Sequence, residues 1–220
     1  MSDTPDWTKQ PTLKEKWDMR YGQHSEYVYG TEPNDFLSEA SRGLPPGDVL
    51  CLADGEGRNG VFLAGLGHRV TAVDLAAAGI AKAEALAAQK GVDITTIVAD
   101  LADYALGESR WDLIVSIFAH TPPPVRVRLH GLMARALRPG GKLILEAYTP
   151  DQCGRGTGGP PTPEGTMTLA DLRTELVDLN IEHGLELVRS VVEGPGHTGD
   201  GAVVQVICTC TRPEAEATVA

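Results

Sequence analysis

The sequence predicts an α/β fold in which five parallel strands are closed by an antiparallel hairpin. Short apolar runs alternate with helix-forming segments over residues 48–148, a pattern typical of a parallel sheet covered by helices. A stretch rich in Gly and Pro at 149–165 ends this alternation. The last two apolar runs are separated by too few residues for a crossover, so they must pair antiparallel. The length of 220 residues corresponds to about one domain.

The first half of the alternation begins after the turn Pro45-Pro46-Gly47. Gly67 and Gly91 each end a helix, and the second helix is rich in alanine, the strongest helix former. The strand after it is β-branched throughout, which favours extended structure. The expected elements are strands at 48–53, 69–73 and 94–98 and helices at 59–66 and 76–89.

The second half continues with the apolar run WDLIVSI, which predicts a strand at 111–117. Apolar residues then recur at helical spacing and predict a helix over 124–137. The sequence Pro139-Gly140-Gly141 turns the chain into a strand expected at 142–148.

The C-terminal part has a different pattern. The Gly/Pro stretch at 149–165 cannot form a regular helix or a central strand, and loops of this length are usually functional. Thr168 and Asp171 indicate a capping box ahead of a helix whose apolar stripe runs from Leu169 to Leu179. The two closing strands are expected at 185–193 and 202–210.

The composition is that of an ordinary globular protein and disfavours several partners. Hydrophobic residues make up 42%, and no apolar run is long enough for a transmembrane helix. Residues 1–10 are polar and lack the features of a signal peptide. The 4 cysteines form no CxxC pattern, so we expect reduced thiols, a cytoplasmic location and no metal site. The net charge of −11 disfavours nucleic acid and membranes and favours a small-molecule partner, with no indication of oligomeric state.

One strand runs directly into a glycine-rich turn, in VLCLADGEGRNG at 49–60. Its glycines let the backbone bend sharply and let a ligand approach closely. Asp74 ends the next strand, where a carboxylate can hold the two hydroxyls of an adenosine ribose. Asp100 follows the third strand and Ser116 lies at the end of the fourth. Because ligands bind at the carboxyl ends of parallel strands, we expect these groups in one site.

The glycine turn allows two cofactor classes. Gly55, Gly57 and Gly60 satisfy the GxGxxG pattern of dinucleotide-binding proteins, so a nicotinamide-dependent oxidoreductase is one interpretation. Asp54 and Glu56, however, would repel a pyrophosphate from the following helix N-terminus. Carboxylates attract positive charge, and S-adenosylmethionine carries a sulfonium, an ammonium and a ribose diol. The charges therefore favour S-adenosylmethionine.

The span from about Trp17 to Cys210 resembles class I S-adenosylmethionine-dependent methyltransferases, most of all small bacterial members related to the tellurite-resistance and thiopurine methyltransferases. The resemblance rests on the order and spacing of VLCLADGEGRN, VTAVD, ADL, WDLIVSIF and LRPGGKLILEAY. It implies a Rossmann-like, doubly wound sheet of seven strands in the order 3-2-1-4-5-7-6. It also implies S-adenosyl-L-methionine as the cofactor.

The resemblance assigns roles to the matching positions. Residues 53–57 would wrap the methionine part of the cofactor, Asp74 would hold the ribose, and Asp100 would accept from the adenine amino group. Residues 116–118 would line the floor near the methyl group. The cofactor-binding candidates are Ala53, Asp54, Gly55, Glu56, Gly57, Asn59, Asp74, Leu75, Asp100, Leu101, Ser116, Ile117 and Phe118. Two positions depart from the usual pattern, since Cys51 replaces an acidic residue and Ala53 replaces the first glycine.

An aromatic segment precedes these motifs. In related methyltransferases such a segment lies over the cofactor as a lid, where aromatic faces can contact the sulfonium. The alternative is that the aromatics only cover the apolar edge of the sheet. We expect a tail and lid at 1–35, a methyltransferase domain at 36–210 and a disordered tail at 211–220. The candidates on the lid and substrate side are Trp17, Arg20, Tyr21, Tyr29, Tyr148 and Arg155.

His120 is the candidate catalytic residue. It follows the fourth strand beside the expected methyl position, where it could act as a general base for a protonated nucleophile. The alternative is a histidine that caps its loop. His68, His130 and His183 are expected at the surface.

The function that follows is the transfer of a methyl group from S-adenosylmethionine to a small molecule, such as a thiol or a chalcogen oxyanion. Two alternatives stay open from the sequence. One is the nicotinamide-dependent oxidoreductase, and the other is a protein that binds S-adenosylmethionine without catalysis.

Overall fold

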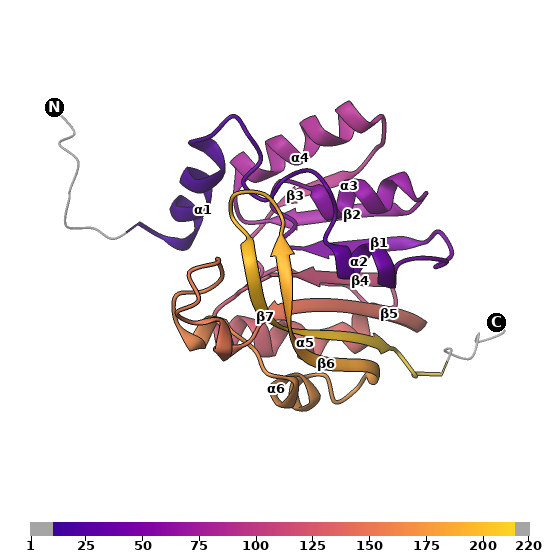
Figure 1. The fold of residues 1–220 in the computed structure, drawn as a ribbon. Coiled ribbons are helices and arrows are strands. Elements are labelled where there is room, and N and C mark those ends of the chain that lie inside the picture. Colours follow the sequence, from indigo (N-terminus) through magenta and orange to yellow (C-terminus); the bar gives the residue numbers. More distant parts are fainter. Residues whose placement is uncertain (1–10, 214–220) are drawn as a thin grey trace, which may run out of the picture.

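The computed structural model describes residues 11–213. Residues 1–10 of the expected segment 1–35 and residues 214–220 of the expected tail 211–220 lie outside the described residues. The seven-stranded sheet has the order β3-β2-β1-β4-β5-β7-β6, which confirms the expected topology (Figure 1). Strands β1 to β5 are parallel, and β7 runs antiparallel to both β5 and β6. The parallel strands are β1 (Asp48–Leu52), β2 (Arg69–Asp74), β3 (Thr95–Val98), β4 (Trp111–Ile117) and β5 (Leu137–Tyr148).

Helices cover both faces of the sheet, and β1 shows how the sequence divides between them. Val49 and Cys51 pack on the face covered by α2 (Asp35–Ala40) and α3 (Arg58–Gly65). Their neighbours Leu50 and Leu52 pack in the cluster that faces the other way. Because side chains alternate along a strand, a continuous apolar run supplies both cores. The helices on the second face are α5 (Pro123–Ala136) and α6 (Leu169–Glu175), while α4 (Ala77–Lys90) packs beside α3.

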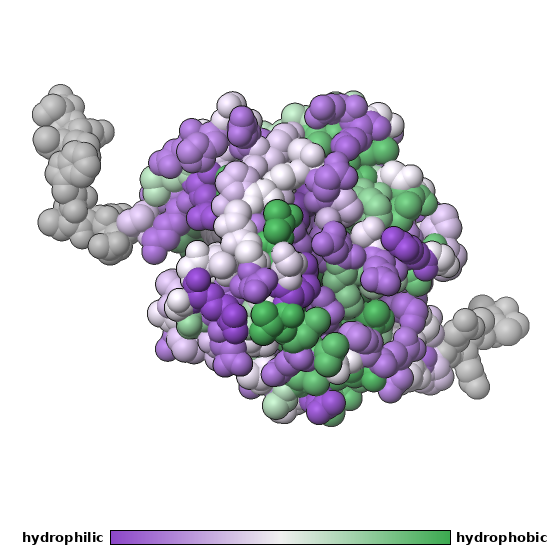
Figure 2. Space-filling view, viewed as in Figure 1, coloured by the Kyte–Doolittle hydropathy of each residue, from purple (hydrophilic) through white to green (hydrophobic). Residues whose placement is uncertain are grey.

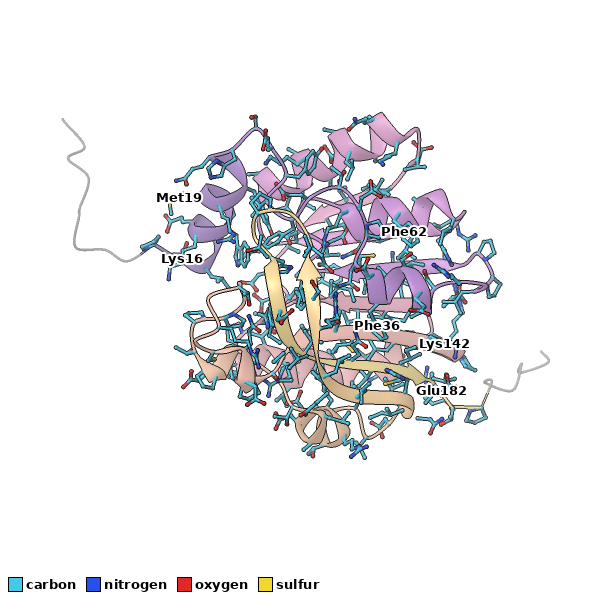
Figure 3. The ribbon with its side chains drawn as sticks, in the orientation of Figure 1. Lys16, Met19, Phe36, Phe62, Lys142 and Glu182 are labelled. Carbon is cyan, nitrogen blue, oxygen red and sulfur yellow. The ribbon has the colours of Figure 1, made fainter. Side chains whose placement is uncertain are left out.

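The closing hairpin is longer than the sequence suggested. Its strands are β6 (Asn180–Val192) and β7 (Thr198–Thr209), and Asn180 already pairs with Thr209. The leucine-rich helix therefore ends at Glu175 instead of reaching Leu179. Figure 3 shows Lys142 of β5 and Glu182 of β6 near this base of the hairpin, with Nζ 2.8 Å from Oε2.

Strand β5 begins before the expected turn. Leu137 pairs with Trp111, and the register shifts before Leu113 pairs with Lys142. The residues of the Pro139-Gly140-Gly141 turn are thus an irregularity inside a strand that was expected to start at 142. The Gly/Pro stretch after β5 contains two short 3₁₀ turns, Pro150–Gln152 and Pro163–Gly165.

Two helices near the N-terminus were not predicted. Helix α1 (Leu13–Gly22) begins at a capping box, in which the Thr12 hydroxyl accepts from the Glu15 amide and the Glu15 carboxylate accepts from the Thr12 amide. It lies against α4 (Figure 1). Helix α2 is capped by the Asn34 side chain, which accepts from the Leu37 amide at 2.9 Å.

No helix in residues 11–213 is long and apolar enough to cross a bilayer. Apolar residues gather on the lower part of the face in Figure 2. The exposed apolar residues of β6 are Leu185, Val188 and Val192.

Helix α2 is held on the sheet by one fully buried side chain, Leu37. We expect Leu37→Ala to lower the free energy of unfolding by about 2–5 kcal/mol, because it leaves a cavity against β1. Leu66→Ala is the matched control, since Leu66 is 45% exposed and its truncation should cost about 0.5 kcal/mol or less. Chemical denaturation monitored by circular dichroism measures both changes. Equal losses would show that α2 is not anchored through Leu37.

Candidate functional site

The glycine turn after β1 has the strained backbone that a closely approached ligand site requires. Ala53, Gly55 and Gly57 have φ values of +49°, +58° and +86°. Gly57 also has no room for a side chain, since a Cβ there would lie 2.5 Å from the Cβ of Ala83 in α4. Ala53 has the left-handed backbone conformation that usually favours glycine, and for a residue with a Cβ this conformation costs about 1–2 kcal/mol.

Asp54 lies beneath this turn. Its carboxylate accepts from the Gly60 amide, with both oxygens within 3.3 Å, and it is 9% exposed. Burial, helped by the nearby Asp74 carboxylate, raises the pKa of Asp54 to about 7, although the Gly60 amide and Arg58 oppose the shift. The carboxylate is thus only partly ionised at neutral pH.

Asp74 ends β2 beside the same turn. Its two oxygens accept from the amides of Gly55 and Ala76, each at 2.8 Å. Burial raises the pKa of Asp74, although these backbone hydrogen bonds oppose the shift. A carboxylate offers about four acceptor positions, so two are left for the hydroxyls of a ligand. Leu75 follows directly at the loop to α4.

Strands β3 and β4 place further predicted residues at the same edge of the sheet. Asp100 follows β3, is exposed, and accepts from the Ala102 amide at 2.8 Å, while Leu101 is buried. Ser116 and Ile117 are buried at the end of β4. Phe118 then turns the chain with a φ of +52°. The structure thus brings the predicted strand-end residues to one edge of the sheet.

An aromatic lid, residues 17–29, covers the glycine turn. The rings of Trp17 and Tyr21 stack with centroids 5.4 Å apart, and Tyr29 meets Tyr21 edge-on. Tyr21 is buried against the turn, since a Cβ on Gly55 would lie 2.7 Å from its hydroxyl. Arg20 lies over the rings of Trp17 and Tyr29. The lid is therefore packed on the turn and not merely on the apolar edge of the sheet.

Glu56 holds the lid in place. One oxygen accepts from the amides of Val28 and Tyr29, at 2.8 and 3.4 Å, and the other is 2.8 Å from the Lys82 ammonium. The sequence analysis assigned this carboxylate to the cofactor. In the structure Lys82 balances its charge and the lid backbone occupies its acceptors.

A hollow of about 730 Å³ lies on the outer side of the lid. It runs between α1, residues 23–28 and the hairpin tip, and it is separate from the glycine turn. Lys16 and Met19, which project from α1 in Figure 3, line it.

A buried network of charges lies behind the glycine turn. Arg58 pairs with Glu193 at 2.5 Å, and Arg189 pairs with both oxygens of Glu146 at 2.7 and 2.8 Å. Arg189 also donates to Glu193, and Asn34 donates to both glutamates. Burial alone would raise the pKa of Glu193, but His197, Arg58 and Arg189 lower it to about 2. No sequence motif predicted this network.

Asn59 joins the same region through the backbone, because its side-chain oxygen accepts from the Asn34 amide at 3.0 Å. This contact ties α3 to the segment that enters α2. Asn59 was predicted to bind the cofactor, and in the structure its oxygen is engaged within the protein.

An aromatic cluster lies where β4 and β5 end. Phe118 stacks on Tyr148 with centroids 4.6 Å apart, and His120 lies 5.6 Å from the Tyr148 ring and 6.1 Å from the Phe118 ring. His197 from the hairpin tip meets Phe118 edge-on. Tyr29 of the lid lies 4.6 Å from the His197 ring. Residues far apart in sequence thus form one wall beside Ser116–Phe118.

His120 is held in one orientation in this cluster. Its Nδ1 lies 2.7 Å from the Gly165 carbonyl oxygen, so it donates there and leaves Nε2 with a lone pair. Burial lowers the pKa of His120 to about 4, against the effect of Gly165 and with a small contribution from His197. The imidazole is therefore neutral at physiological pH.

Other predicted residues lie elsewhere. Arg155 is exposed and donates to the Asp151 carbonyl, away from the cluster. The expectation that His68 and His130 lie at the surface was wrong. His68 is buried and accepts from the Gly47 amide, while His130 is buried 2.6 Å from Glu175, so local partners satisfy both rings. In the described part of the chain, no group of His, Cys, Asp and Glu side chains is arranged to hold a metal.

A comparison with known protein families finds a match to the central part of this chain. Residues 49–141 match the family described as a methyltransferase domain. This part of the chain, somewhat less than half of it, is similar to methyltransferase domains. The match spans the glycine turn, Asp74, Asp100 and Ser116–Phe118, and it confirms the predicted resemblance to methyltransferases. A search of curated proteins finds no match.

Several solved structures share the fold of this chain. One comes from work on the conversion of a disulfide bond into a thioacetal group during echinomycin biosynthesis, with a TM-score of 0.74, 21% identity and 94% coverage of both chains. TehB from Haemophilus influenzae has a TM-score of 0.68 and 19% identity, covering 88% of this chain and 66% of TehB. A SAM-dependent methyltransferase from Methanosarcina mazei has a TM-score of 0.61 and 20% identity, covering 81% and 98%. At these identities the similarity shows a shared fold.

The raised pKa of Asp54 has a consequence for stability. The folded state binds a proton at Asp54 more tightly than the unfolded chain between pH 3.8 and about 7. The contribution of this group to the free energy of unfolding therefore falls as the pH rises through that window, by up to about 4 kcal/mol.

We expect Asp54→Asn to be more stable than the wild type at pH 8, because it removes a buried charge. The advantage should shrink as the pH falls and disappear near pH 4. Urea denaturation of both proteins at several pH values measures the difference. A difference that is constant with pH would show that the folded-state pKa is not raised.

Proposed function

We propose that this methyltransferase transfers a methyl group from S-adenosylmethionine to a small molecule. The observation that carries the proposal is the position of Asp74, which borders the glycine turn at the carboxyl end of β2 and keeps free acceptor positions. The aromatic lid and the hairpin tip meet backbone to backbone over this edge, where the Gly196 amide donates to the Val28 carbonyl at 2.8 Å. An edge covered in this way suits a small acceptor better than a polymer.

The chain's residues fit the cofactor in the order of the strands. Backbone groups of Ala53, Gly55 and Gly57 would wrap the methionine part, and Asp54 would supply charge beneath it. Asp74 with Leu75 would hold the ribose, Asp100 with Leu101 would flank the adenine, and Ser116, Ile117 and Phe118 would lie near the methyl group. Bound S-adenosylmethionine supplies an electrophilic methyl group on a cationic sulfur.

The lid would complete this site. Trp17, Tyr21 and Tyr29 offer aromatic faces on the side of the glycine turn, and such faces attract a sulfonium. Residues 1–35 would then act as tail and lid, 36–210 as the methyltransferase domain and 211–220 as a tail. Glu56 would serve mainly to hold the lid shut through Val28 and Lys82.

His120 would act as the general base. Its Nε2 is buried without a partner, and its neutral form persists because the pKa is lowered to about 4. A base this weak does not ionise a free thiol or hydroxyl. It takes the proton only as the nucleophile bonds to carbon, when the X–H group becomes strongly acidic. The role of the fixed geometry is to align nucleophile and methyl group.

The acceptor is proposed to be a soft nucleophile such as a thiol or a chalcogen oxyanion. The similarity to TehB and to the structure associated with disulfide chemistry in echinomycin biosynthesis supports this proposal. The methyltransferase domain and the acidic turn disfavour a nicotinamide cofactor. A protein that binds S-adenosylmethionine without catalysis is the remaining alternative, and the presence or absence of methyl transfer separates the two.

Asp74→Ala should weaken S-adenosylhomocysteine binding by about tenfold or more, because a carboxylate that accepts two ribose hydroxyls is lost. Asp93→Ala, an exposed carboxylate before β3, is the control and should bind normally. Isothermal titration calorimetry with S-adenosylmethionine, S-adenosylhomocysteine and NADH measures the affinities. Binding of NADH alone would overturn the proposed function.

His120→Asn should lower kcat by about 10²–10⁴-fold with a protonated acceptor. The asparagine amide can still donate to the Gly165 carbonyl, so only the base is lost. The affinity for S-adenosylhomocysteine should be unchanged, which calorimetry checks. In the wild type, kcat should hold between pH 8 and 5 and fall as the pH approaches about 4. An unchanged kcat in the variant would exclude His120 as the base.

A further inference from the structure

Buried polar atoms without partners gather on one side of the site. A buried polar group without a hydrogen bond destabilises the folded state, so several together point to a missing ligand. Three such atoms border the aromatic cluster and the charge network, and a fourth, Nδ1 of His197, faces Glu193 at 3.5 Å. The three are Arg58 Nη1, His120 Nε2 and Tyr148 Oη.

The contacts between these residues connect them in space. Arg58 and His197 approach the same oxygen of Glu193, at 2.5 and 3.5 Å. The His197 ring lies 5.6 Å from the Tyr148 ring, and Tyr148 lies 5.6 Å from the His120 ring. The side chains that carry the three unpartnered atoms are therefore linked in one series that runs from α3, past the hairpin tip, to the loop after β4.

The chemistry of the three atoms is complementary to one kind of ligand. Arg58 Nη1 is a cationic donor, and Tyr148 Oη stays a donor because burial, followed by the charges of Glu193 and Glu146, raises its pKa. Neither glutamate is free to satisfy them, since Arg58, Arg189, Asn34 and Gln205 occupy the carboxylates. The cationic Arg58 Nη1 and the neutral Tyr148 Oη can therefore both donate hydrogen bonds to an anionic oxygen of a ligand. His120 Nε2 is the acceptor for a proton.

We propose that the methyl acceptor carries an anionic oxygen as well as its nucleophilic X–H group, and that Arg58 Nη1 and Tyr148 Oη bind this oxygen. The inference rests on the proposed function. In the reaction the X–C bond forms while the S–CH₃ bond breaks with its electron pair going to sulfur, and the X–H proton passes to His120 Nε2. The oxyanion contacts orient the acceptor so that its X–H group faces His120.

Arg58 and Tyr148 can be altered without unpairing the network. Arg58→Lys keeps a cation beside Glu193 but removes the unpartnered nitrogen. Tyr148→Phe removes only the hydroxyl. Because that hydroxyl has no partner, its loss should not lower the melting temperature. Tyr27→Phe is the comparison, since the Tyr27 hydroxyl donates to the Lys82 carbonyl at 3.1 Å and its loss should lower the melting temperature.

The test uses calorimetric titration of mercaptoacetate and of neutral 2-mercaptoethanol into the full chain saturated with S-adenosylhomocysteine. We expect mercaptoacetate to bind at least tenfold more tightly than 2-mercaptoethanol. Tyr148→Phe and Arg58→Lys should each weaken mercaptoacetate binding at least tenfold and leave 2-mercaptoethanol and S-adenosylhomocysteine binding unchanged.

Several outcomes would overturn the inference. These are equal binding of the two thiols, binding of neither, or unchanged mercaptoacetate binding in both variants. Weaker S-adenosylhomocysteine binding by Arg58→Lys would assign Arg58 to the cofactor. A melting temperature that falls further in Tyr148→Phe than in Tyr27→Phe would make the hydroxyl structural. Failure of the wild type to bind S-adenosylhomocysteine would instead overturn the proposed function, so the two failures are distinguishable.

Discussion

The buried charge network is the constraint on which the arrangement of this protein depends. An ion buried without a partner costs on the order of several kcal/mol, so Arg58, Glu146 and Glu193 can be buried only together with their partner Arg189, whose side chain is 14% exposed. They come from α3, β5 and the hairpin, and Asn34 adds the segment before α2. Their pairing therefore fixes where the helix after the glycine turn, the central sheet and the hairpin tip lie relative to one another.

The network also joins the two halves of the site. The floor is made by strand ends, whose positions follow from the parallel sheet. The roof is made by the lid, which Glu56 holds through the Val28 amide, and by the hairpin tip, which carries His197. Because Glu193 lies just before that tip and pairs with Arg58, the same contact that stabilises the fold holds the roof over the floor.

Local sequence patterns predicted the strand ends that form one side of the site. The charge network depends on contacts between residues far apart in the sequence, so it was not predicted. The apolar runs and the glycine turn specified β1 to β4 and the positions of Asp74 and Asp100, because each depends on residues close in sequence. The network was missed because Arg58 and Glu193 look like ordinary surface charges when read alone. A signal was present in β5 and β7, where Glu146 and Gln205 interrupt apolar runs and are joined by a hydrogen bond of 2.7 Å. The helices α1 and α2 were missed because their apolar stripes are short.

Strand β7 follows the other six strands in the sequence, yet in the sheet it lies between β5 and β6. During synthesis on the ribosome, β6 has no neighbouring strand to pair with until residues 198–209 have emerged. Until then Glu146 also lacks the hydrogen bond that it accepts from the Gln205 side chain. N-terminal parts of a chain can collapse before the end is translated. Here the nascent chain holds an open sheet edge at β5, and only the final strand closes it. The sheet, and with it the hairpin tip over the site, is therefore completed only after residue 209 has been translated.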